Sequence, residues 1–225
     1  MARKGIVVAI DGPAGAGKST VARRVAEALG YTLVDTGAIY RAVALLAQRA
    51  GVAPTQDAVL GDIVRGLNIS FELAGGVNRM LVSGEDVTGA IRTPAVSMLA
   101  STVSARPTVR EGLLPLQRKL AGEGGAVLEG RDIGTVVCPD AAVKIYLDAS
   151  PEERARRRHA EEVSRGKASD STQVLADVKR RDAQDQGRAL APLKPAPDAL
   201  RIDSTALSID QVVAKIVAAA RKAAP

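Results

Sequence analysis

The fold of this 225-residue chain is decided by the stretch Gly12-Pro13-Ala14-Gly15-Ala16-Gly17-Lys18-Ser19-Thr20. An apolar run over residues 5–10 precedes it and predicts a buried strand. Apolar residues at helical spacing follow it, at Val21, Val25, Ala28 and Leu29. This order of strand, glycine-rich loop and helix, with the spacing GxxxxGK followed by serine or threonine, is the pattern of a phosphate-binding loop.

The residue types in this loop explain how it would hold phosphate. Glycines let the backbone turn so that several N–H groups point into one concavity, and the helix N-terminus behind them adds partial positive charge. Lys18 adds a point charge for the β- and γ-phosphates, and the Ser19 hydroxyl is a ligand for Mg²⁺. A glycine-rich turn with an incidental lysine is the alternative, but the flanking strand and helix favour a site for a nucleoside triphosphate.

The composition limits the class of protein. The chain is 46% hydrophobic and 25% charged, which is ordinary for a globular protein with one full core and a smaller lobe. The apolar runs are too short for a membrane span, and we expect no cleavable signal at the N-terminus. A single cysteine, Cys138, excludes an internal disulfide and is expected to be a buried, inert thiol, and the single histidine, His159, excludes a multi-histidine metal site. These features indicate a reducing cytoplasm.

The chain is basic, with a net charge of +6 and a pI of about 9.7. A positive net charge is compatible with two kinds of ligand. One is nucleic acid, and the other is a small phosphorylated molecule bound by several arginines. Aromatic residues make up only 2% of the chain, so few stacking platforms exist for single-stranded nucleic acid. We therefore favour small phosphorylated ligands.

The order of elements predicts an α/β fold. Strands expected at 6–10, 31–34, 126–129, 143–147 and 200–203 alternate with helices, which implies a parallel sheet with helices on both faces. Three consecutive short strands expected at 68–73, 79–82 and 85–91 are separated by Gly75-Gly76 and Ser83-Gly84 and do not suit such a core. We interpret them as an inserted antiparallel lobe.

Three segments rich in arginine are candidates for binding phosphate. Gly130-Arg131-Asp132 follows an expected core strand, so its side chains would lie at the carboxyl edge of the sheet, where open α/β sheets bind ligands. The other two segments lie on expected helices, at 154–158 and 181–188, where a solvated face laced with ion pairs is the alternative. Thr36 lies near the start of a further expected helix at that edge and Arg41 about one turn in. Taken alone, these two residues are better explained by a helix cap at Thr36 and a solvated Arg41.

These motifs together resemble the bacterial cytidylate kinases, a family of nucleoside monophosphate (NMP) kinases, from Val7 to Ala219. The resemblance is carried by GPAGAGKST at 12–20, VDTGAIYR at 34–41, GEDVTGAIRT at 84–93, EGRDIGTVV at 129–137, KIYLDAS at 144–150 and RRDAQDQGRALAPL at 180–193. It implies a five-stranded parallel core over 1–60 and 105–225, with a lid at about 151–172. It also implies an NMP-binding lobe at 61–104.

The resemblance implies a role for each matching position. The phosphate of the acceptor, CMP, would be bound by Thr36, Arg41, Arg131 and Arg188. Its cytosine would be bound by Ser101, Arg110 and Asp132, and its sugar by Arg181 and Asp185. ATP would be bound by residues 12–20 and by the lid residues Arg154, Arg157 and Arg158. Lys18, Arg131, Arg158 and Arg188 would act on the transferred phosphoryl group, and Ser19 would hold Mg²⁺.

The implied reaction converts ATP and CMP or dCMP into ADP and CDP or dCDP by direct in-line transfer. A kinase for another small acceptor, such as UMP, AMP or a non-nucleotide hydroxyl, is one alternative. A nucleotide-switched binding protein is another, although the chain lacks the guanine-reading tetrapeptide NKxD. A nucleic-acid binder is the least supported. We expect a cytoplasmic monomer that acts on small molecules, without a nucleic-acid or membrane partner.

Overall fold

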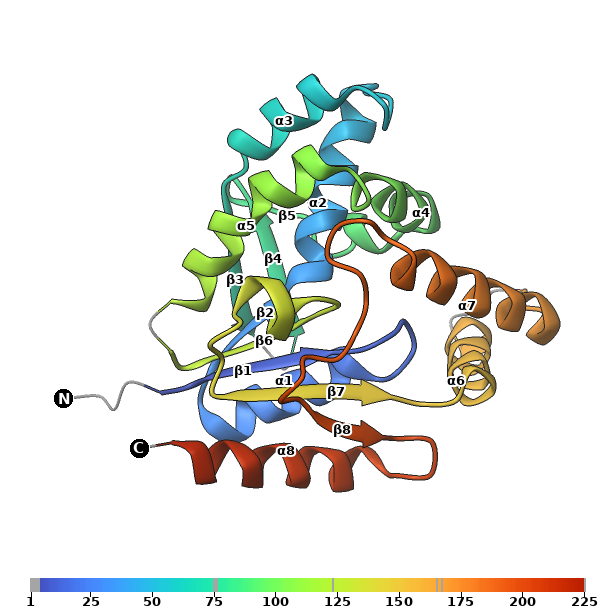
Figure 1. Ribbon diagram of the computed structural model, residues 1–225. Coiled ribbons are helices and arrows are strands. Elements are labelled where there is room, and N and C mark those ends of the chain that lie inside the picture. The colour runs from blue at the N-terminus through green and yellow to red at the C-terminus, as the bar shows by residue number, and fades with distance from the viewer. Residues whose placement is uncertain (1–4, 75–76, 123, 165, 167, 225) are drawn as a thin grey trace. The chain divides into compact units, whose positions relative to one another are not determined.

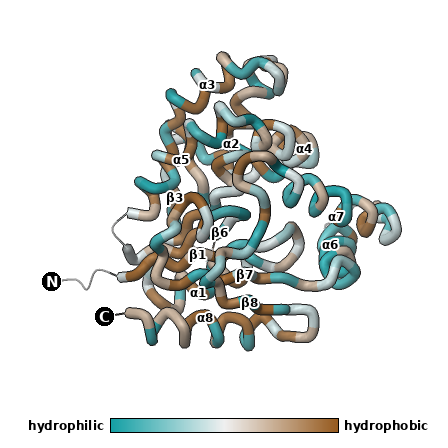
Figure 2. Tube along the Cα trace, in the orientation of Figure 1, coloured by the Kyte–Doolittle hydropathy of each residue, from teal (hydrophilic) through white to brown (hydrophobic). Residues whose placement is uncertain are grey.

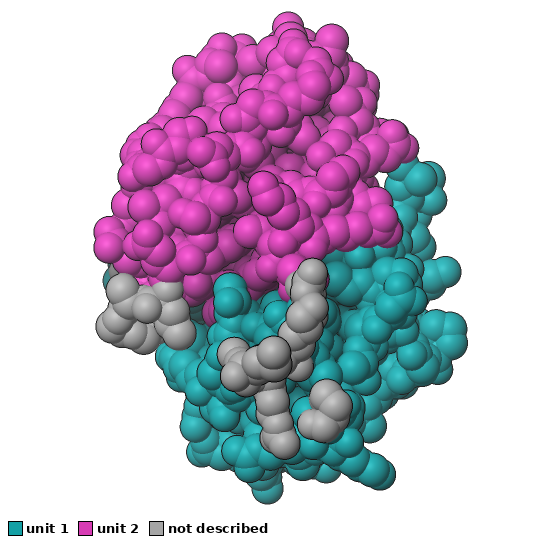
Figure 3. Space-filling model, turned by 90° about the vertical axis from the view of Figure 1, so that its left-hand side faces the viewer, with its two compact units in different colours: residues 1–32, 123–225 teal, residues 33–122 magenta. Residues whose placement is uncertain are grey.

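The computed structural model describes residues 5–74, 77–122, 124–164, 166 and 168–224 (Figure 1). The chain divides into two compact units, which Figure 3 distinguishes by colour. Unit 1 comprises residues 1–32 and 123–225, and unit 2 comprises residues 33–122. Among the described residues, no helix has both the length and the apolar character needed to cross a membrane.

The central element is a five-stranded sheet in the order β2-β6-β1-β7-β8. Its strands are β1 (Val7–Asp11), β2 (Thr32–Asp35), β6 (Ala126–Gly130), β7 (Val143–Asp148) and β8 (Leu200–Asp203). β1 pairs in parallel with β6 and β7, and β7 pairs in parallel with β8. The side chains of β1 and β6 are almost wholly buried, which explains why these strands are near-continuously apolar. The predicted parallel core is confirmed.

The helices of unit 1 form two pairs. α1 (Lys18–Leu29) and α8 (Ile209–Ala223) pack together along one face of the sheet (Figure 1). α6 (Pro151–Ser164) packs against α7 (Ser171–Gln186) around a small core of Ala155, Val174 and Val178. Figure 2 shows that α6 and α7 are predominantly hydrophilic, whereas the central strands are hydrophobic. The second pair therefore has little apolar surface to bury.

Unit 2 contains four helices and the second sheet among its described residues. The helices are α2 (Thr36–Arg49), α3 (Asp57–Arg65), α4 (Pro94–Val103) and α5 (Pro107–Ala121), and a short 3₁₀ turn, η1 (Ala90–Arg92), precedes α4. β3 (Ile69–Ala74), β4 (Val77–Val82) and β5 (Glu85–Asp86) form an antiparallel sheet in this order. The predicted antiparallel insert is confirmed, with positive φ angles at Ser83 and Gly84 in its second turn. The predicted turn at Gly75-Gly76 lies outside the described residues.

The third strand of this insert is shorter than predicted. We expected it to span Glu85–Ile91, but β5 ends at Asp86. The Asp86 carboxylate accepts a hydrogen bond from the Thr88 N–H at 2.9 Å, and the Thr88 hydroxyl accepts one from the Met80 N–H at 2.9 Å. A side chain therefore takes the place of a backbone partner for β4, and the chain turns into η1 instead of continuing the ladder.

Candidate active site

The phosphate-binding loop joins β1 to α1 through glycines with positive φ angles. Gly12 has a φ of +151°, and a β-carbon there would lie only 1.9 Å from the carbonyl oxygen of Leu147 in β7. Gly17, with a φ of +90°, is the N-cap of α1. Only glycine adopts both conformations readily, so the sequence pattern of the loop follows from its geometry.

Lys18 is buried beneath the loop and lies among other charges. Its ammonium group donates a hydrogen bond to the carbonyl oxygen of Pro13 at 2.7 Å, and the residue is 6% exposed. Burial lowers the pKa of Lys18 to about 7, helped by the positive charges of Arg131 and Arg181, while Glu129 opposes the shift. Three predicted site residues are thus close enough to interact electrostatically within unit 1.

Two acidic residues at strand ends hold the surrounding segments. The Ser19 hydroxyl donates to the Glu129 carboxylate at 3.0 Å. The Asp11 carboxylate accepts hydrogen bonds from the N–H groups of Ile133 and Gly134, both at 2.8 Å. Burial raises the pKa of Asp11 to about 6, although both amide hydrogen bonds oppose the shift. Asp11 thereby fixes the π-helical turn η2 (Ile133–Val137), which immediately follows the predicted site residues at 131 and 132.

One buried carboxylate holds two of the predicted phosphate-binding arginines. Asp185, which is 1% exposed, accepts from Arg131 Nε at 2.8 Å and also from Arg188 Nη2. Burial raises the pKa of Asp185, but these two guanidinium groups outweigh it and hold the pKa below its usual value. The predicted helical face is wrong for Arg188, because α7 ends at Gln186 and Arg188 follows its C-cap. The burial of Asp185 also shows that these ion pairs are not a solvated surface. Asp132 is also buried, at 6% exposure.

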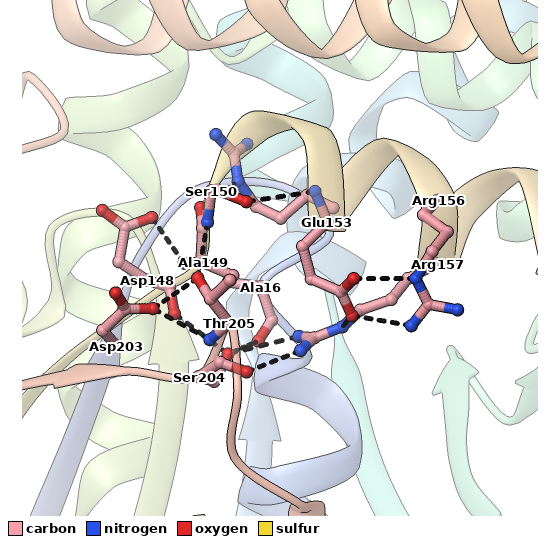
Figure 4. Close-up of polar contacts among 11 residues, drawn as sticks. Ala16, Asp148, Ala149, Ser150, Glu153, Arg156, Arg157, Asp203, Ser204 and Thr205 are labelled. Carbon is pink, nitrogen blue, oxygen red and sulfur yellow. Dashed lines mark hydrogen bonds and ion pairs between the residues drawn. The ribbon is translucent and has the colours of Figure 1, made fainter.

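The lid arginines differ in their surroundings. Arg158 is the most exposed of the three predicted to bind ATP and pairs with Glu162 at 3.1 Å. Arg157 donates to the hydroxyl and the carbonyl oxygen of Ser204 at 3.2 and 2.7 Å (Figure 4). Arg154 is 3% exposed and donates to the carbonyl oxygens of Ala149 and Ala14 and to the Asp182 carboxylate. Direct contact of these side chains with ATP stays a prediction.

Figure 4 also shows how α6 begins. The pattern Ser150-Pro151-Glu152-Glu153 predicts a capping box with proline at the first helical position. One half of it is present, because the Ser150 hydroxyl accepts from the Glu153 N–H at 3.2 Å. The reciprocal half of the box is absent from these residues, since the Ser150 N–H donates to the Thr205 hydroxyl at 2.9 Å while Glu153 pairs with Arg157. The start of α6 is therefore attached to the segment after β8.

Unit 2 carries the other four predicted site residues. Asp35 caps α2, accepting from the Ala38 N–H at 2.8 Å and from Arg41 Nη2 at 2.9 Å. This places Arg41 beside the first turn of α2, which begins at Thr36. The Nε atom of Arg41 is buried without a hydrogen-bond partner among the described residues. A cation and a helix N-terminus at one place suit an anion.

The predicted cytosine-reading residues of unit 2 are connected through Ser104. Arg110 lies over the ring of Tyr40, 5.3 Å from its centroid, and donates to the Ser104 carbonyl oxygen at 3.1 Å. The Ser104 hydroxyl donates in turn to the Ser101 carbonyl oxygen at 3.0 Å. The nine residues predicted to bind CMP thus form one group in unit 2 and another in unit 1.

Sequence reasoning missed several residues that hold the site together, namely Asp11, Glu129, Asp35, Asp182 and Ser204. Asp11, Asp35 and Glu129 end or nearly end strands that lead into predicted site segments, and this position could have identified them. Nothing local marks Asp182 or Ser204, because their partners are 28 and 47 residues away in the sequence.

The fold and the phosphate-binding loop define a P-loop protein, and solved structures share the architecture. An uncharacterized protein from Eubacterium ventriosum superposes with a TM-score of 0.55 at 15% identity, covering 97% of this chain and 99% of that one. A gluconokinase from Sinorhizobium meliloti gives 0.50 at 16% identity, covering 99% and 95%. At these identities the likeness concerns the fold alone.

Sequence comparison identifies the family. The Cytidylate kinase family profile matches residues 8–222. The cytidylate kinase of Geobacter sulfurreducens is 54% identical over 220 residues, covering 98% of this chain and 94% of that protein. The cytidylate kinase of Pasteurella multocida is 47% identical over 210 residues, covering 93% and 92%.

These findings define the protein as a P-loop kinase. The chain belongs to the cytidylate kinase family, and it is a transferase that phosphorylates CMP with ATP.

Proposed function

We propose that the two groups of residues bind one CMP, or dCMP, while the loop over residues 12–20 binds ATP. In this proposal Thr36, Arg41, Arg131 and Arg188 bind the acceptor phosphate. Ser101, Arg110 and Asp132 bind cytosine, and Arg181 and Asp185 bind the sugar. Arg154, Arg157 and Arg158 belong to a lid on the ATP side, at about 151–172, and residues 61–104 form the NMP-binding lobe.

The observation that supports this most directly is the cation cluster of unit 1. Lys18 lies near enough to Arg131 and Arg181 for their charges to lower its pKa. Mutual repulsion of this kind is relieved when anionic oxygens bind among the cations. Two nucleotides that meet through their phosphates supply such anions. The planar guanidinium group also matches paired phosphate oxygens better than an ammonium group does.

The reaction requires positioning and charge stabilisation more than acid–base chemistry. The attacking oxygen of CMP is already ionised near neutral pH, so no strong general base is required. Charge on the equatorial oxygens of the transferred group is stabilised by Lys18 and the converging arginines. A lid that closes over the donor excludes water, which would otherwise accept the phosphoryl group.

The choice of base follows from hydrogen-bonding patterns. Cytosine presents an amino donor beside ring-nitrogen and carbonyl acceptors. The carboxylate of Asp132 matches the donor, and the guanidinium of Arg110 matches the acceptors. Uracil places an acceptor opposite the carboxylate, so UMP should bind less well than CMP. Loss of one hydrogen bond to a charged group weakens the binding free energy by on the order of a few kcal/mol.

The residues present are suited to Mg²⁺. Ser19 and Glu129 offer hard oxygen atoms within hydrogen-bonding distance of one another. No group of three or more His, Cys, Asp or Glu side chains placed to hold a metal ion exists among the described residues. Mg²⁺ is commonly held by few side chains together with phosphate oxygens and water. We propose that Ser19 ligates the ion, which supplies charge neutralisation when it is bound. We also propose that the protein is a monomer and acts in the cytoplasm.

The test is a substrate panel with ATP and Mg²⁺. CMP, dCMP, UMP and AMP are compared by kcat/KM in a coupled assay for ADP. We expect CMP and dCMP to be preferred over UMP, and AMP to be the poorest acceptor. Equal kcat/KM for UMP and CMP would contradict the base-reading roles of Asp132 and Arg110.

A further inference from the structure

The phosphate-binding loop is held from behind by side chains that bind its carbonyl groups. Arg154 Nη1 donates to the Ala14 carbonyl oxygen at 3.1 Å, and Lys18 Nζ donates to that of Pro13 at 2.7 Å. The Ser204 hydroxyl lies 3.5 Å from the carbonyl oxygen of Ala16 (Figure 4). Two carbonyl groups of the loop, those of Pro13 and Ala14, are thus held by side-chain donors, while the Ser204 hydroxyl donates at 2.9 Å to the Asp148 carbonyl oxygen.

Anchoring a carbonyl group also orients an amide. In a planar trans peptide the C=O and the N–H of the same unit point in opposite directions. Fixing the Ala14 carbonyl therefore directs the Gly15 N–H away from Arg154. Amides that point together into the loop are the groups that bind phosphate oxygens. Arg154 can thus set the direction of a phosphate-binding N–H without touching phosphate.

Arg154 is itself held rigidly. Its Nε donates to the Ala149 carbonyl oxygen at 2.9 Å, and its Nη1 and Nη2 donate to the two Asp182 carboxylate oxygens at 3.0 and 2.6 Å. The Arg154 side chain is 3% exposed and that of Asp182 15%. Packing against the loop is also close, because a β-carbon at Gly15 would lie 3.2 Å from the β-carbon of Arg154.

We propose that Asp182 is a positioning residue for ATP, acting through Arg154 on the Ala14–Gly15 peptide. The inference rests on the proposed function of the loop. Asp182 lies on α7, between Arg181 and Asp185, so one helix carries both the support of the donor loop and side chains assigned to CMP. A bidentate pair fixes the plane of the guanidinium group, which a single hydrogen bond would not do.

The first test measures ADP and CMP binding separately by calorimetry, which requires no turnover. In Asp182→Asn the amide keeps one acceptor but turns an N–H toward the guanidinium group, so the bidentate pair is lost. We expect ADP affinity to fall about tenfold, the scale of one hydrogen bond to a charged group, with CMP affinity within about twofold of the wild type. Asp177→Asn is the matched control, because Asp177 lies on the same helix and pairs with Arg180 at an exposed site, and it should leave both affinities unchanged.

Two results would overturn the proposal. One is ADP binding by Asp182→Asn that equals the wild type. The other is an equal loss for ADP and CMP, which would mean that the pair stabilises the unit as a whole. A wild-type protein that bound neither nucleotide would instead refute the proposed function, so the two failures are distinguishable.

A second variant covers the case in which Asp182→Asn does not fold. Arg154→Lys keeps the positive charge but cannot engage Asp182 and Ala14 with the same planar set of donors. We expect Arg154→Lys alone to lower ADP affinity several-fold, by no more than about tenfold, with CMP affinity within about twofold of the wild type. If Asp182→Asn does fold, the double variant should lose no more ADP affinity than the larger single loss. Losses that multiply, or an unchanged ADP affinity in Arg154→Lys, would show that the two residues do not act on the loop as one support.

Discussion

The hydroxyl of Ser19 donates a hydrogen bond to the carboxylate of Glu129 across 3.0 Å, joining the first turn of α1 to β6. The carboxylate thereby orients the hydroxyl oxygen through its proton. We expect Ser19→Ala and Glu129→Gln each to raise the Mg²⁺ concentration needed for half-maximal turnover. For Glu129→Gln, which removes the carboxylate that orients the hydroxyl, the increase should be about tenfold. A Mg²⁺ titration at saturating ATP and CMP measures this. The same midpoint in Glu129→Gln and in the wild type would remove Glu129 from the metal site.

Replacing Lys18 should separate turnover from CMP binding. We expect Lys18→Met to lower kcat by about a hundredfold or more, since one preorganised charge on the transferred group is lost. CMP affinity measured by calorimetry should stay within about twofold of the wild type, because Lys18 serves the donor phosphates. A normal kcat in this variant would exclude the loop from the mechanism.

The same replacement should stabilise the fold near neutral pH. Burial lowers the pKa of Lys18 to about 7, so between pH 7 and the usual value of 10.5 the unfolded chain binds more protons than the folded one. The free energy of unfolding of the wild type should therefore rise with pH over this window. Lys18→Met should unfold at higher urea concentration than the wild type at pH 7, with the difference narrowing at pH 9. A constant difference would contradict the lowered pKa.

Asp11 should make CMP binding sensitive to acid. Its pKa is raised to about 6, and protonation removes one of the two acceptors for the N–H groups of Ile133 and Gly134. We expect KM for CMP to rise as pH falls through about 6, with KM for ATP less affected. A raised carboxyl pKa favours the folded state on acidification toward the usual value of 3.8, so titration of Asp11 does not itself unfold the protein in this window.

Asp11→Asn is the control for that profile. It shares with the wild type the titration of the CMP phosphate, whose second pKa is about 6, but it has no carboxyl group at position 11. Its KM for CMP should be raised at pH 8 and should vary less between pH 5 and 8. Identical profiles for the two proteins would assign the acid sensitivity to the substrate.

Asp132 should discriminate between pyrimidine bases. Asp132→Asn replaces a pure acceptor with a side chain that also donates, so CMP should lose on the order of tenfold to a hundredfold in kcat/KM and UMP much less. ATP binding should be nearly unchanged. Asp140→Asn, at an exposed position in the same unit, is the control. Equal losses for ATP and CMP in Asp132→Asn would contradict the base-reading role.

The sequence predicts the parts of this fold that depend on local patterns. Val7–Asp11 and Ala126–Gly130 are buried on both faces, so their apolar runs are unambiguous. The predicted length of the strand at Glu85–Ile91 was wrong. The Met80 N–H of the neighbouring strand donates to the Thr88 hydroxyl and not to a backbone carbonyl group. The capping box at Ser150 was half right because Thr205, 55 residues away, supplies the second contact. Long-range side-chain contacts have no local signal.

The candidate site shows the same division. The glycine and lysine positions of the loop could be predicted because backbone geometry dictates them. The pairing of Arg131 and Arg188 on Asp185 could not, since it depends on a contact 54 residues apart that only the folded unit 1 creates. Spacing placed Asp185 on one helical face with Arg188, but an exposed ion pair has the same spacing, and only burial distinguishes the two.

Gly12 has a consequence for how this protein can change. The obstacle to a β-carbon there is the main chain of β7, not the flexible end of a side chain, so neither rotamer adjustment nor a compensating smaller neighbour can create room. A saturation library at this codon should yield a single functional residue, whereas Ala14, which is only partly buried, offers a site where variants can be selected. We therefore expect that mutations which alter the ATP-binding pocket will not occur at Gly12.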